Sequence, residues 1–386
     1  MKKTIKELYI KIKNSSIIDI LFYIGVGIFA FSRVYEYSTL IELTKSIKSV
    51  LRILSFGFLL PKVVFQDYDK KDIPMVLMLY VYTIVCICFS KDKNTIILPT
   101  LLVGCKGINI RKVINIIFTV LLSALVIHCV AFMVVYTKTN GDFLSMFHLS
   151  SHPVKNIILY RDNNMYGFRF ACCTMLYIYL TDRNKDRYLK SLILFLLSIF
   201  MLLLCQSRTS FIMIVMAIGY LLFENNIFNK LNMNVVKYVV VVLSIIISFM
   251  LPIIGSNKEI FLFGKINILL SNRPAIYNTA INVLGIHLLP NIKNFDNVSN
   301  MVGSYTRPDN SYISTLLRWG IILTVLIALI TYLLIRKEKD KLNNYYICIM
   351  AICFIVEYAS IRYMLYALPL IVSNSYFNNI KQEKME

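Results

Sequence analysis

Apolar runs of helical length alternate with short polar segments along most of the chain. A helix of about 20 mainly apolar residues can cross the hydrocarbon core of a bilayer with its backbone groups satisfied internally. We therefore expect an all-α, polytopic membrane protein with about twelve transmembrane helices in a single integral membrane domain, residues 1–386. The predicted spans are residues 17–31, 47–64, 73–90, 95–105, 113–136, 166–181, 188–205, 210–223, 235–254, 312–335, 345–359 and 363–377.

Two long polar segments interrupt this pattern, residues 137–165 and 255–311. The second carries Arg273, Lys293, Asp296, Arg307 and Asp309 among turn-forming residues and has no apolar run of 18 residues. A lysine-rich amino terminus predicts a cytoplasmic start, and alternating the sides from there places both segments outside. We expect a large extracellular loop at 255–311 and a smaller one at 137–165.

The distribution of basic residues supports this topology along most of the chain, because the cytoplasmic side of a membrane protein carries an excess of lysine and arginine. Lys91 and Lys93, in a short turn assigned outside, are the main exception. The loops assigned inside carry Lys62, Lys70, Lys71, Lys106, Arg111, Lys112, Arg183, Lys185, Arg187, Lys190, Lys230, Lys237, Arg336, Lys337, Lys339, Lys341, Lys381 and Lys384.

One part of the large loop, residues 272–285, has the pattern of an amphipathic helix. Asn272 offers an N-cap ahead of Arg273 and Pro274, and proline is well tolerated in the first turn of a helix. Five apolar residues can share one face, namely Ala275, Ile276, Ala280, Ile281 and Leu284. We predict that this helix lies nearly flat on the membrane, with an amino end whose dipole favours phosphate.

The composition agrees with a membrane protein and argues against a nucleic-acid-binding protein or a metalloprotein. Of 386 residues, 58% are hydrophobic and 16% charged, and the mean hydropathy is +0.66. The net charge of +20 does not indicate nucleic-acid binding, because the basic residues cluster between apolar runs as topology signals and contacts to anionic lipid. The nine cysteines lie in or beside apolar segments and the four histidines are scattered, so we expect no metal site and no cofactor.

Charged residues on the predicted outer face need another explanation, because topology does not require them there. They are Arg161, Arg208, Arg273, Arg307 with Asp309, and Glu357 with Arg362. Arginine suits phosphate and pyrophosphate, since its fork donates two parallel hydrogen bonds and its charge does not titrate. The loop tyrosines Tyr277, Tyr305 and Tyr312 could stack on sugar rings.

Each of these residues also has an ordinary structural interpretation. Arg161 and Arg208 lie at span ends and could reach lipid headgroups. Arg273 and Arg307 could form a loop-stabilising salt bridge with Asp296 or Glu259. Asp309 could cap the following helix, because Asp-Asn-Ser before an apolar run is a helix start signal. His287 is more simply a loop residue than a base.

Three motifs around the large loop resemble the O-antigen ligase and polymerase superfamily, specifically the Wzy-type polymerases of capsular polysaccharide. They are QSRTSFIMIVMAIGYLLF, NRPAIYNTAI and DNSYISTLLRWGII, in that order, and the earlier RDNNMYGF resembles the family's arginine-containing entry into a middle span. The motifs are short and cover about residues 161–320, while the span pattern covers the entire chain.

The resemblance implies a substrate, a reaction and a set of site residues. The substrate is an oligosaccharide repeat unit on undecaprenyl pyrophosphate at the outer face of the cytoplasmic membrane. The reaction transfers the growing glycan to a sugar hydroxyl on the next unit, with inversion and without a metal or cofactor. Arg208 and Arg273 would bind pyrophosphate, and Arg161 or Arg307 would assist or guide the glycan. The other residues expected to bind substrate are Asn310, Tyr312, Tyr277, Arg362 and Glu357. Implied partners, besides these lipid-linked oligosaccharides and membrane lipid, are the flippase and chain-length regulator of the same pathway; no nucleic acid is expected.

One departure from the family concerns the base that activates the acceptor. The family's ligases commonly show His-Asn where this chain has Asp309 and Asn310, which puts Asp309 in the place of that base. Glu357 near Arg362 is a second candidate for this role.

Two alternatives to a polymerase stay open at this point. A ligase would move a finished glycan from the same carrier to another acceptor. A flippase or exporter of lipid-linked sugars would also have about twelve spans. No matched pair of Gly- or Pro-broken helices is visible, and the charges lie mainly in predicted loops and turns, which favours an enzyme over a transporter.

Overall fold

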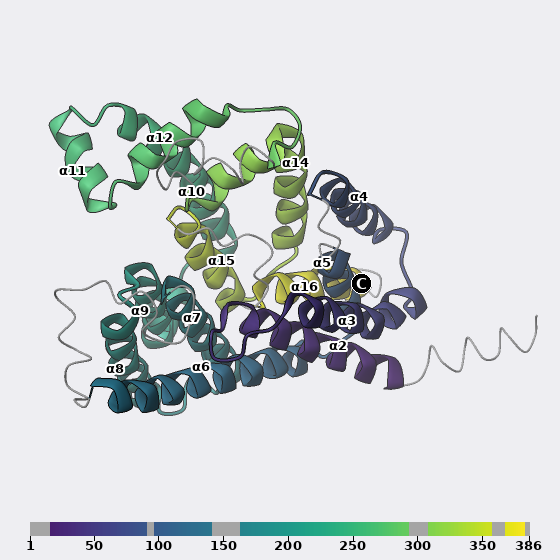
Figure 1. Ribbon diagram of the computed structural model, residues 1–386. Coiled ribbons are helices and arrows are strands. Elements are labelled where there is room, and N and C mark those ends of the chain that lie inside the picture. The colour runs from purple at the N-terminus through teal and green to yellow at the C-terminus, as the bar shows by residue number, and fades with distance from the viewer. Residues whose placement is uncertain (1–15, 91–95, 141–162, 293–307, 357–366, 383–386) are drawn as a thin grey trace, which may run out of the picture. The chain divides into compact units, whose positions relative to one another are not determined.

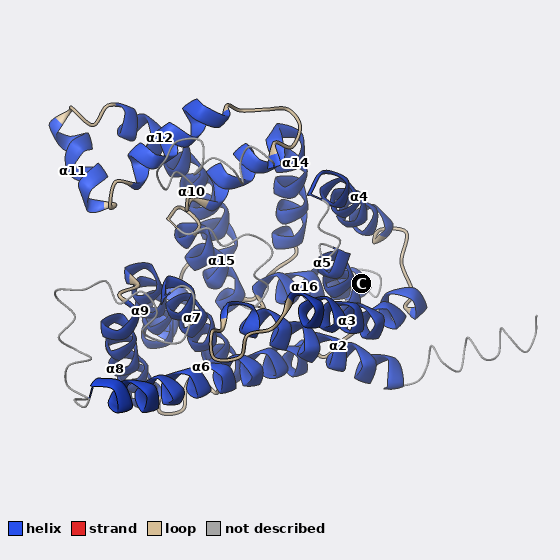
Figure 2. Ribbon diagram, viewed as in Figure 1, coloured by secondary structure: helices blue, strands red, loops and turns tan. Residues whose placement is uncertain are grey.

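The computed structural model describes residues 16–90, 96–140, 163–292, 308–356 and 367–382, and every long element among them is a helix (Figures 1 and 2). The predicted all-α class is therefore confirmed for this part of the chain. The residues form two compact units, each assembled from separate stretches. Among the described residues, unit 1 comprises 16–72, 97–140, 163–229 and 367–382, and unit 2 comprises 73–90, 96, 230–292 and 308–356.

Six described helices are long and apolar enough to cross a membrane, which fits a membrane-embedded protein. The predicted number of about twelve spans is not confirmed by the described residues, because several predicted spans form shorter helices. The fourth predicted span, for example, contains a helix of 8 residues, about 12 Å long, which cannot cross a bilayer core of about 30 Å alone. The six helices are Ser16–Val34, Ile110–Val134, Arg187–Cys205, Arg208–Phe228, Met233–Ser256 and Ser311–Arg336.

Unit 1 is built on helix pairs that pack along their length. Helix α2 packs against α3 and α6, α7 against α6 and α9, α8 against α9, and α5 against α3 and α16. Its helices are α2 (Ser16–Val34), the 3₁₀ turn η1 (Tyr35–Tyr37), α3 (Lys45–Phe65), α5 (Ile97–Gly104), α6 (Ile110–Asn140), α7 (Asn163–Leu180), α8 (Arg187–Cys205), α9 (Arg208–Phe223), the π-helical turn η4 (Glu224–Phe228) and α16 (Leu368–Gln382).

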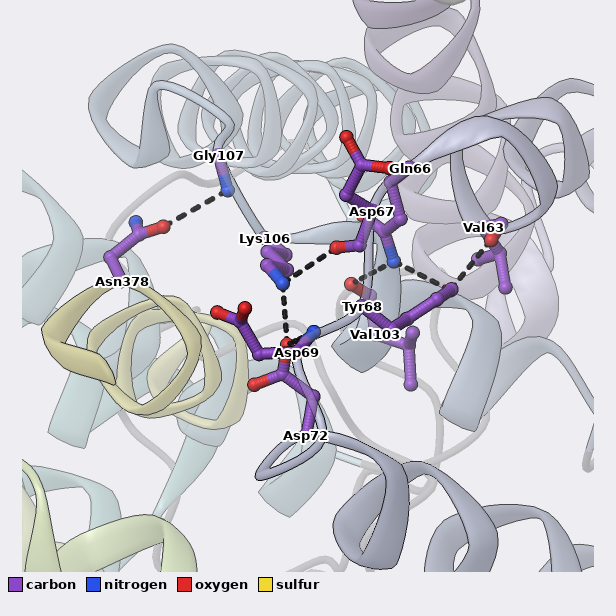
Figure 3. Close-up of polar contacts among 10 residues, drawn as sticks. All are labelled: Val63, Gln66, Asp67, Tyr68, Asp69, Asp72, Val103, Lys106, Gly107 and Asn378. Atoms are coloured by element: carbon purple, nitrogen blue, oxygen red, sulfur yellow. Dashed lines mark hydrogen bonds and ion pairs between the residues drawn. The ribbon is translucent and has the colours of Figure 1, made fainter. Parts of the chain in front are cut away.

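The short helix α5 is held at its carboxyl end by side chains from distant segments. Lys106, just beyond the helix, donates to Asp72 Oδ2 at 2.5 Å and to the carbonyl of Asp67 at 2.6 Å (Figure 3). Asp72 is fully buried and Lys106 is nearly so. In α16, Ser373 Oγ donates to the Leu102 carbonyl at 2.7 Å. Lys106 is thus a buried structural cation, in addition to its predicted place in a cytoplasmic loop.

Unit 2 is built around α10, which packs against α12 and α15, while α14 packs against α4. Its helices are α4 (Ile73–Ser90), α10 (Met233–Ser256), α11 (Phe261–Leu269), α12 (Arg273–Leu284), α14 (Ser311–Arg336) and α15 (Lys341–Cys353). Helices α11 and α12 make the predicted large loop, residues 255–311, partly helical, as expected. The smaller predicted loop is helical at both edges, since α6 continues to Asn140 and α7 begins at Asn163.

Lys237 joins three helices at one end of unit 2. Its ammonium group donates to the Ile335 carbonyl at 2.8 Å, the Glu338 carbonyl at 2.6 Å and Asn344 Oδ1 at 3.0 Å, and the residue is 1% exposed. A buried ammonium with three acceptors is satisfied in the way that burial requires. Lys237 therefore fixes the start of α10 against the end of α14, and it too is structural and not only a topology signal.

Helix α14 is broken at Gly320, where the backbone adopts φ 73° and ψ 175°. The segment after α12 fills the break, because Ile321 N–H donates to the His287 carbonyl at 2.9 Å and Asn291 N–H donates to the Arg318 carbonyl at 3.0 Å. A Cβ on Gly320 would lie 2.6 Å from the carbonyl oxygen of Leu289. Only glycine combines this φ with so close an approach. The apolar pattern of this span does not predict the break.

Candidate functional site

The candidate site lies in unit 2, where the amino ends of α12 and α14 meet the carboxyl ends of α10 and α15. A hydrophobic cluster holds these ends together. Ile254, Ile276, Ile281 and Ile355 pack at its edge. Because apolar burial is the main source of packing energy, this cluster fixes the first turns of both helices. Its buried members are Leu251, Tyr277, Ala280, Leu284, Ile313 and Leu317.

Helix α12 agrees with the predicted amphipathic helix, with some differences in its buried face. Ala280 and Leu284 are buried as predicted, while Pro274 and Tyr277 complete the face. Tyr277 is fully buried in the cluster. The stacking role predicted for Tyr277 would require its ring to leave this core, so its observed place is structural.

The amino end of α12 is capped differently from the prediction. Asn272 occupies the N-cap position with φ 63°, but its side chain makes no capping hydrogen bond. Asn267 of α11 provides the cap instead: its Oδ1 accepts from Ala275 N–H at 3.1 Å and its Nδ2 donates to Asn272 Oδ1 at 2.8 Å. Arg273 N–H donates to the Leu270 carbonyl at 3.1 Å. These first-turn amides are already bound, so a phosphate would meet the helix dipole and the Arg273 side chain.

Gly255 allows the last turn of α10 to touch the first turn of α12. A Cβ at this position would lie 2.2 Å from the Pro274 carbonyl oxygen and 2.6 Å from Ala275 N. No side chain fits between two backbones at these distances. The glycine therefore sets the position of Arg273, the residue next to Pro274.

Helix α14 begins at a side-chain cap that also docks it on the end of α15. Asn310 Oδ1 accepts from Ile313 N–H at 3.0 Å, and its Nδ2 donates to the Ile355 carbonyl at 2.8 Å. Ser311 N–H donates to the Phe354 carbonyl at 2.8 Å, and Tyr312 Oη donates to the Ala351 carbonyl at 3.1 Å. The predicted cap role of Asp309 is thus wrong, because Asn310 performs it. Asn310 and Tyr312, both predicted to bind substrate, hold the helix junction.

Arg273 and Asp309 form an ion pair at this junction. Arg273 Nη2 lies 3.7 Å from Asp309 Oδ2, and the Arg273 Nη1 group donates to the Val356 carbonyl. The two side chains are 21% and 31% exposed, so both can reach solvent. Of the salt-bridge partners predicted for Arg273, Glu259 is not the one observed and Asp296 lies outside the described residues. The two residues that the sequence singled out as clamp and base lie side by side.

This arrangement offers a cation and a carboxylate within one ligand's reach. The pair is neutral as a whole, and a distance of 3.7 Å is longer than a direct hydrogen bond, so an incoming phosphoryl oxygen can compete for the guanidinium. The carboxylate can then accept a proton from a bound hydroxyl. Among the described residues, no group of three or more His, Cys, Asp or Glu side chains could hold a metal ion.

Arg208 lies at the start of α9 in unit 1, beside a tight turn. Gln206, with φ 55°, ends α8, and only Ser207 separates it from Arg208. The Arg208 side chain is exposed, and the described residues provide no hydrogen-bond or ion-pair partner for it. Since Arg208 and Arg273 belong to different units, their joint binding of one pyrophosphate is still a prediction.

The remaining predicted site residues lie outside the described residues. These are Arg161, Arg307, Glu357 and Arg362, together with Tyr305. His287 is described, and its Nε2 lies 2.5 Å from the Leu284 carbonyl, while its own carbonyl accepts from Ile321 N–H. His287 therefore serves the loop that fills the α14 break, as its simpler interpretation held.

Two buried arginines were not recognised from the sequence. Arg318, 6% exposed, lies in α14 two residues before the break at Gly320. Arg169, 2% exposed, lies in α7 and donates to the carbonyls of Arg33, at 2.8 Å, and Val34 at the end of α2. The available signal was their position, because an arginine within an apolar run is costly unless it has a buried partner.

Comparison with protein-family models, with curated proteins and with solved structures found no match to this chain.

Proposed function

We propose that this protein polymerises undecaprenyl-pyrophosphate-linked oligosaccharide units into capsular polysaccharide at the outer face of the cytoplasmic membrane. The proposal starts from the motif resemblance and is carried by one observation, the ion pair of Arg273 and Asp309 at the junction of α12, α14 and α15. The six long apolar helices fit a substrate that is anchored in lipid.

The pair suggests how one site can serve both ends of the reaction. The pyrophosphate of the donor binds Arg273 and displaces Asp309 from it, because a phosphoryl group forms stronger charge-assisted hydrogen bonds with a guanidinium. Asp309 then accepts the proton of the acceptor hydroxyl while the hydroxyl oxygen forms a bond to the anomeric carbon of the donor sugar. The bond from that carbon to the phosphate oxygen breaks, and undecaprenyl pyrophosphate leaves with the electron pair, stabilised by Arg273. Attack from the opposite face inverts the anomeric centre.

Arg208, and the arginines at 161 and 307, would supply further positive charge in this proposal. A pyrophosphate carries more charge than one guanidinium neutralises, so a second arginine is expected to contribute. The exposed side chain of Arg208 is available for this role.

The test is complementation of a deletion strain, with lipid-linked glycans and surface polysaccharide resolved by size. We expect the deletion to leave single repeat units on lipid, and wild type to restore a ladder. Asp309→Asn should restore none, since an amide cannot take the proton. Glu259→Ala is the matched control, because it removes an exposed carboxylate of the same segment that is not paired with Arg273. A full ladder from Asp309→Asn would remove Asp309 as the base.

A second variant separates the clamp from a structural role of Arg273. Arg273→Lys keeps a cation beside Asp309 and the Val356 carbonyl but cannot form a bidentate phosphate contact. We expect a normal melting temperature and no ladder. A full ladder would mean that Arg273 serves only to join the helices. Long chains left on lipid in the deletion strain would identify a ligase instead.

One observation favours transport as the second candidate. Helix α14 is broken at Gly320 and α5 has 8 residues, and discontinuous helices line substrate sites in many transporters. A transporter predicts that the deletion strain shows no repeat unit at the outer face of the membrane. A polymerase predicts single units there.

A further inference from the structure

A cluster of cations surrounds the end of α2 in unit 1 and shares no residue with the candidate site. We call it the Arg33 cluster; its members are Arg33, Glu36, Lys48, Arg52 and Arg169. Arg33 Nη1 donates to Glu36 Oε2 and Arg52 Nη2 donates to Glu36 Oε1, each at 2.9 Å. Lys48 donates to the Glu36 carbonyl at 3.3 Å, and Arg169 donates to the Arg33 carbonyl at 2.8 Å.

The cluster contains more positive than negative charges. Four cationic side chains lie around the end of α2 and the following turn: Arg33 and Arg52 bind the Glu36 carboxylate, and Lys48 and Arg169 bind backbone carbonyls. Glu36 is the only carboxylate that the described residues pair with Arg33 or Arg52. Arg169 also faces the carbonyl end of α2, where the helix dipole is worth roughly half a negative charge. The cluster still carries an excess of more than two positive charges, about the charge of a phosphate or pyrophosphate group.

Burial makes this excess significant. The side chains of Arg33, Arg52 and Glu36 are only 14%, 15% and 22% exposed. The Nε groups of Arg33 and Arg52 are buried and have no hydrogen-bond partner among the described residues. A buried N–H donor without an acceptor is unfavourable, and water screens charges weakly where the side chains are mostly buried. An anion that entered this partly open cluster would find donors and charge already in place.

The segment that carries Glu36 is held in one conformation. Ser38 Oγ accepts from Ile41 N–H at 3.0 Å and lies 2.7 Å from His128 Nε2. His128 Nδ1 lies 2.7 Å from the Ala124 carbonyl and therefore carries the proton, so Nε2 accepts from the Ser38 hydroxyl. His128 and Ser38 are 1% and 2% exposed. The cluster is thus preorganised, which lowers the entropic cost of binding.

We infer that the Arg33 cluster is a binding site for a phosphoryl anion, formed by Arg33, Arg52 and Lys48 around the turn after α2. Two guanidinium groups and an ammonium match an anion with several acceptor oxygens and more than one charge. A ligand with a single carboxylate would leave part of the excess positive charge of the cluster uncompensated. The inference does not rest on the proposed function, because a lipid headgroup, a lipid-linked pyrophosphate and a free phosphate share this chemistry.

The competing explanation is a purely structural network, in which the arginines join α2, α3 and α7 through Glu36 and two carbonyls. Replacing Glu36 distinguishes the two explanations, because they predict different effects on anion binding. In a structural network it is the central partner, so its loss lowers stability and has no effect on anions. In an anion site it competes with the ligand for the same donors, so its loss tightens binding.

The experiment measures binding of inorganic pyrophosphate by titration calorimetry, with the full chain in nanodiscs of neutral lipid. All variants carry Arg208→Gln and Arg273→Gln, so that the proposed pyrophosphate clamp contributes no binding and the outcome is independent of it. We expect Arg52→Gln to weaken binding by about tenfold and Glu36→Gln to strengthen it by a few-fold. Lys45→Gln is the matched control, since it removes an exposed cation from the same helix, and should change nothing.

Melting temperatures identify variants that fail to fold, and Glu36→Gln and Arg33→Lys serve as conservative changes where Arg52→Gln unfolds the protein. The titration is repeated in nanodiscs that contain phosphatidylglycerol. Loss of pyrophosphate binding there indicates a headgroup in the site, and retained binding indicates a soluble or carrier-linked phosphoryl group; both support the inference. Binding of equal strength in Arg52→Gln, Glu36→Gln and the parent, or no binding in the parent in either lipid, would overturn it.

Discussion

The contact between Gly255 and the start of α12 allows a quantitative test of how the candidate site is positioned. In Gly255→Ala the new Cβ would lie 2.3 Å from the Pro274 carbonyl carbon. Ordinary contact between carbon atoms begins at about 3.5 Å. The first turn of α12 must therefore move by roughly 1 Å, because neither neighbour is a flexible side chain that could give way.

The shift should affect both stability and function. Overpacking of this kind costs about 1–3 kcal/mol. A catalytic group displaced by about 1 Å can lower a rate by about a hundredfold. Arg273 is the first residue of the displaced turn and moves with it, and its contact with Asp309 at 3.7 Å has little tolerance for a shift of that size. We expect loss of the polysaccharide ladder with a moderate loss of stability.

The assay compares thermal unfolding in detergent with complementation of the deletion strain. Gly219→Ala is the matched control, since a Cβ there meets no atom within 4 Å and its φ is not positive. Alanine is favoured over glycine in a helix by about 0.5–1 kcal/mol, so this variant should be as stable as wild type or slightly more so. If Gly255→Ala behaved like Gly219→Ala in both assays, the position of α12 on α10 would be irrelevant to the site.

Three further predictions test separate parts of the structure. Asn310→Ala removes the cap of α14 and the donor to the Ile355 carbonyl, so it should cost about 1–2 kcal/mol in detergent unfolding; an unchanged midpoint would contradict the cap. Lys237→Met leaves three acceptors without their donor and should cost at least about 2 kcal/mol; a neutral result would mean that water or backbone movement replaces the ammonium. Leu262→Trp, made with Trp319→Phe so that it is the single tryptophan, should be quenched by brominated lipid, because α11 exposes Leu262 by 61%; quenching by aqueous iodide alone would place α11 in water.

Local sequence patterns predicted where helices form more successfully than where they cross a membrane. Each predicted span contains helical residues, since apolar periodicity and capping residues act over a few positions. Span length depends on more than the apolar run. Helix α5 ends after Gly104, where Lys106 turns to Asp72 and side chains of α16 bind the last carbonyls. That termination comes from residues far away in the sequence.

Prediction of the candidate site from the sequence is limited in the same way. Arg273 and Asp309 were both identified by residue type and position, yet their pairing was not, because it depends on how α12 and α14 meet over the end of α15. Asn310 was predicted to bind substrate, and its role as the helix cap was not predicted, since the cap position follows from the backbone and not from the motif alone. Tyr277 was predicted to be able to stack on a sugar ring, but its position on α12 places it among buried apolar neighbours.

The basic character of this chain has a structural component besides the topology signal in its loops. Several cations bind carbonyls at or beyond the carboxyl ends of helices. Among them, Arg111 binds Leu180 in α7, Arg169 binds α2, Lys237 binds α14, and Arg273 binds Val356 beyond α15. Such carbonyls have no partner within their own helix, and a bilayer offers no water to replace one. A cation also complements the dipole at that end. Arg273 therefore combines a helix-capping contact with its proposed role, which ties the geometry of the site directly to the packing of unit 2.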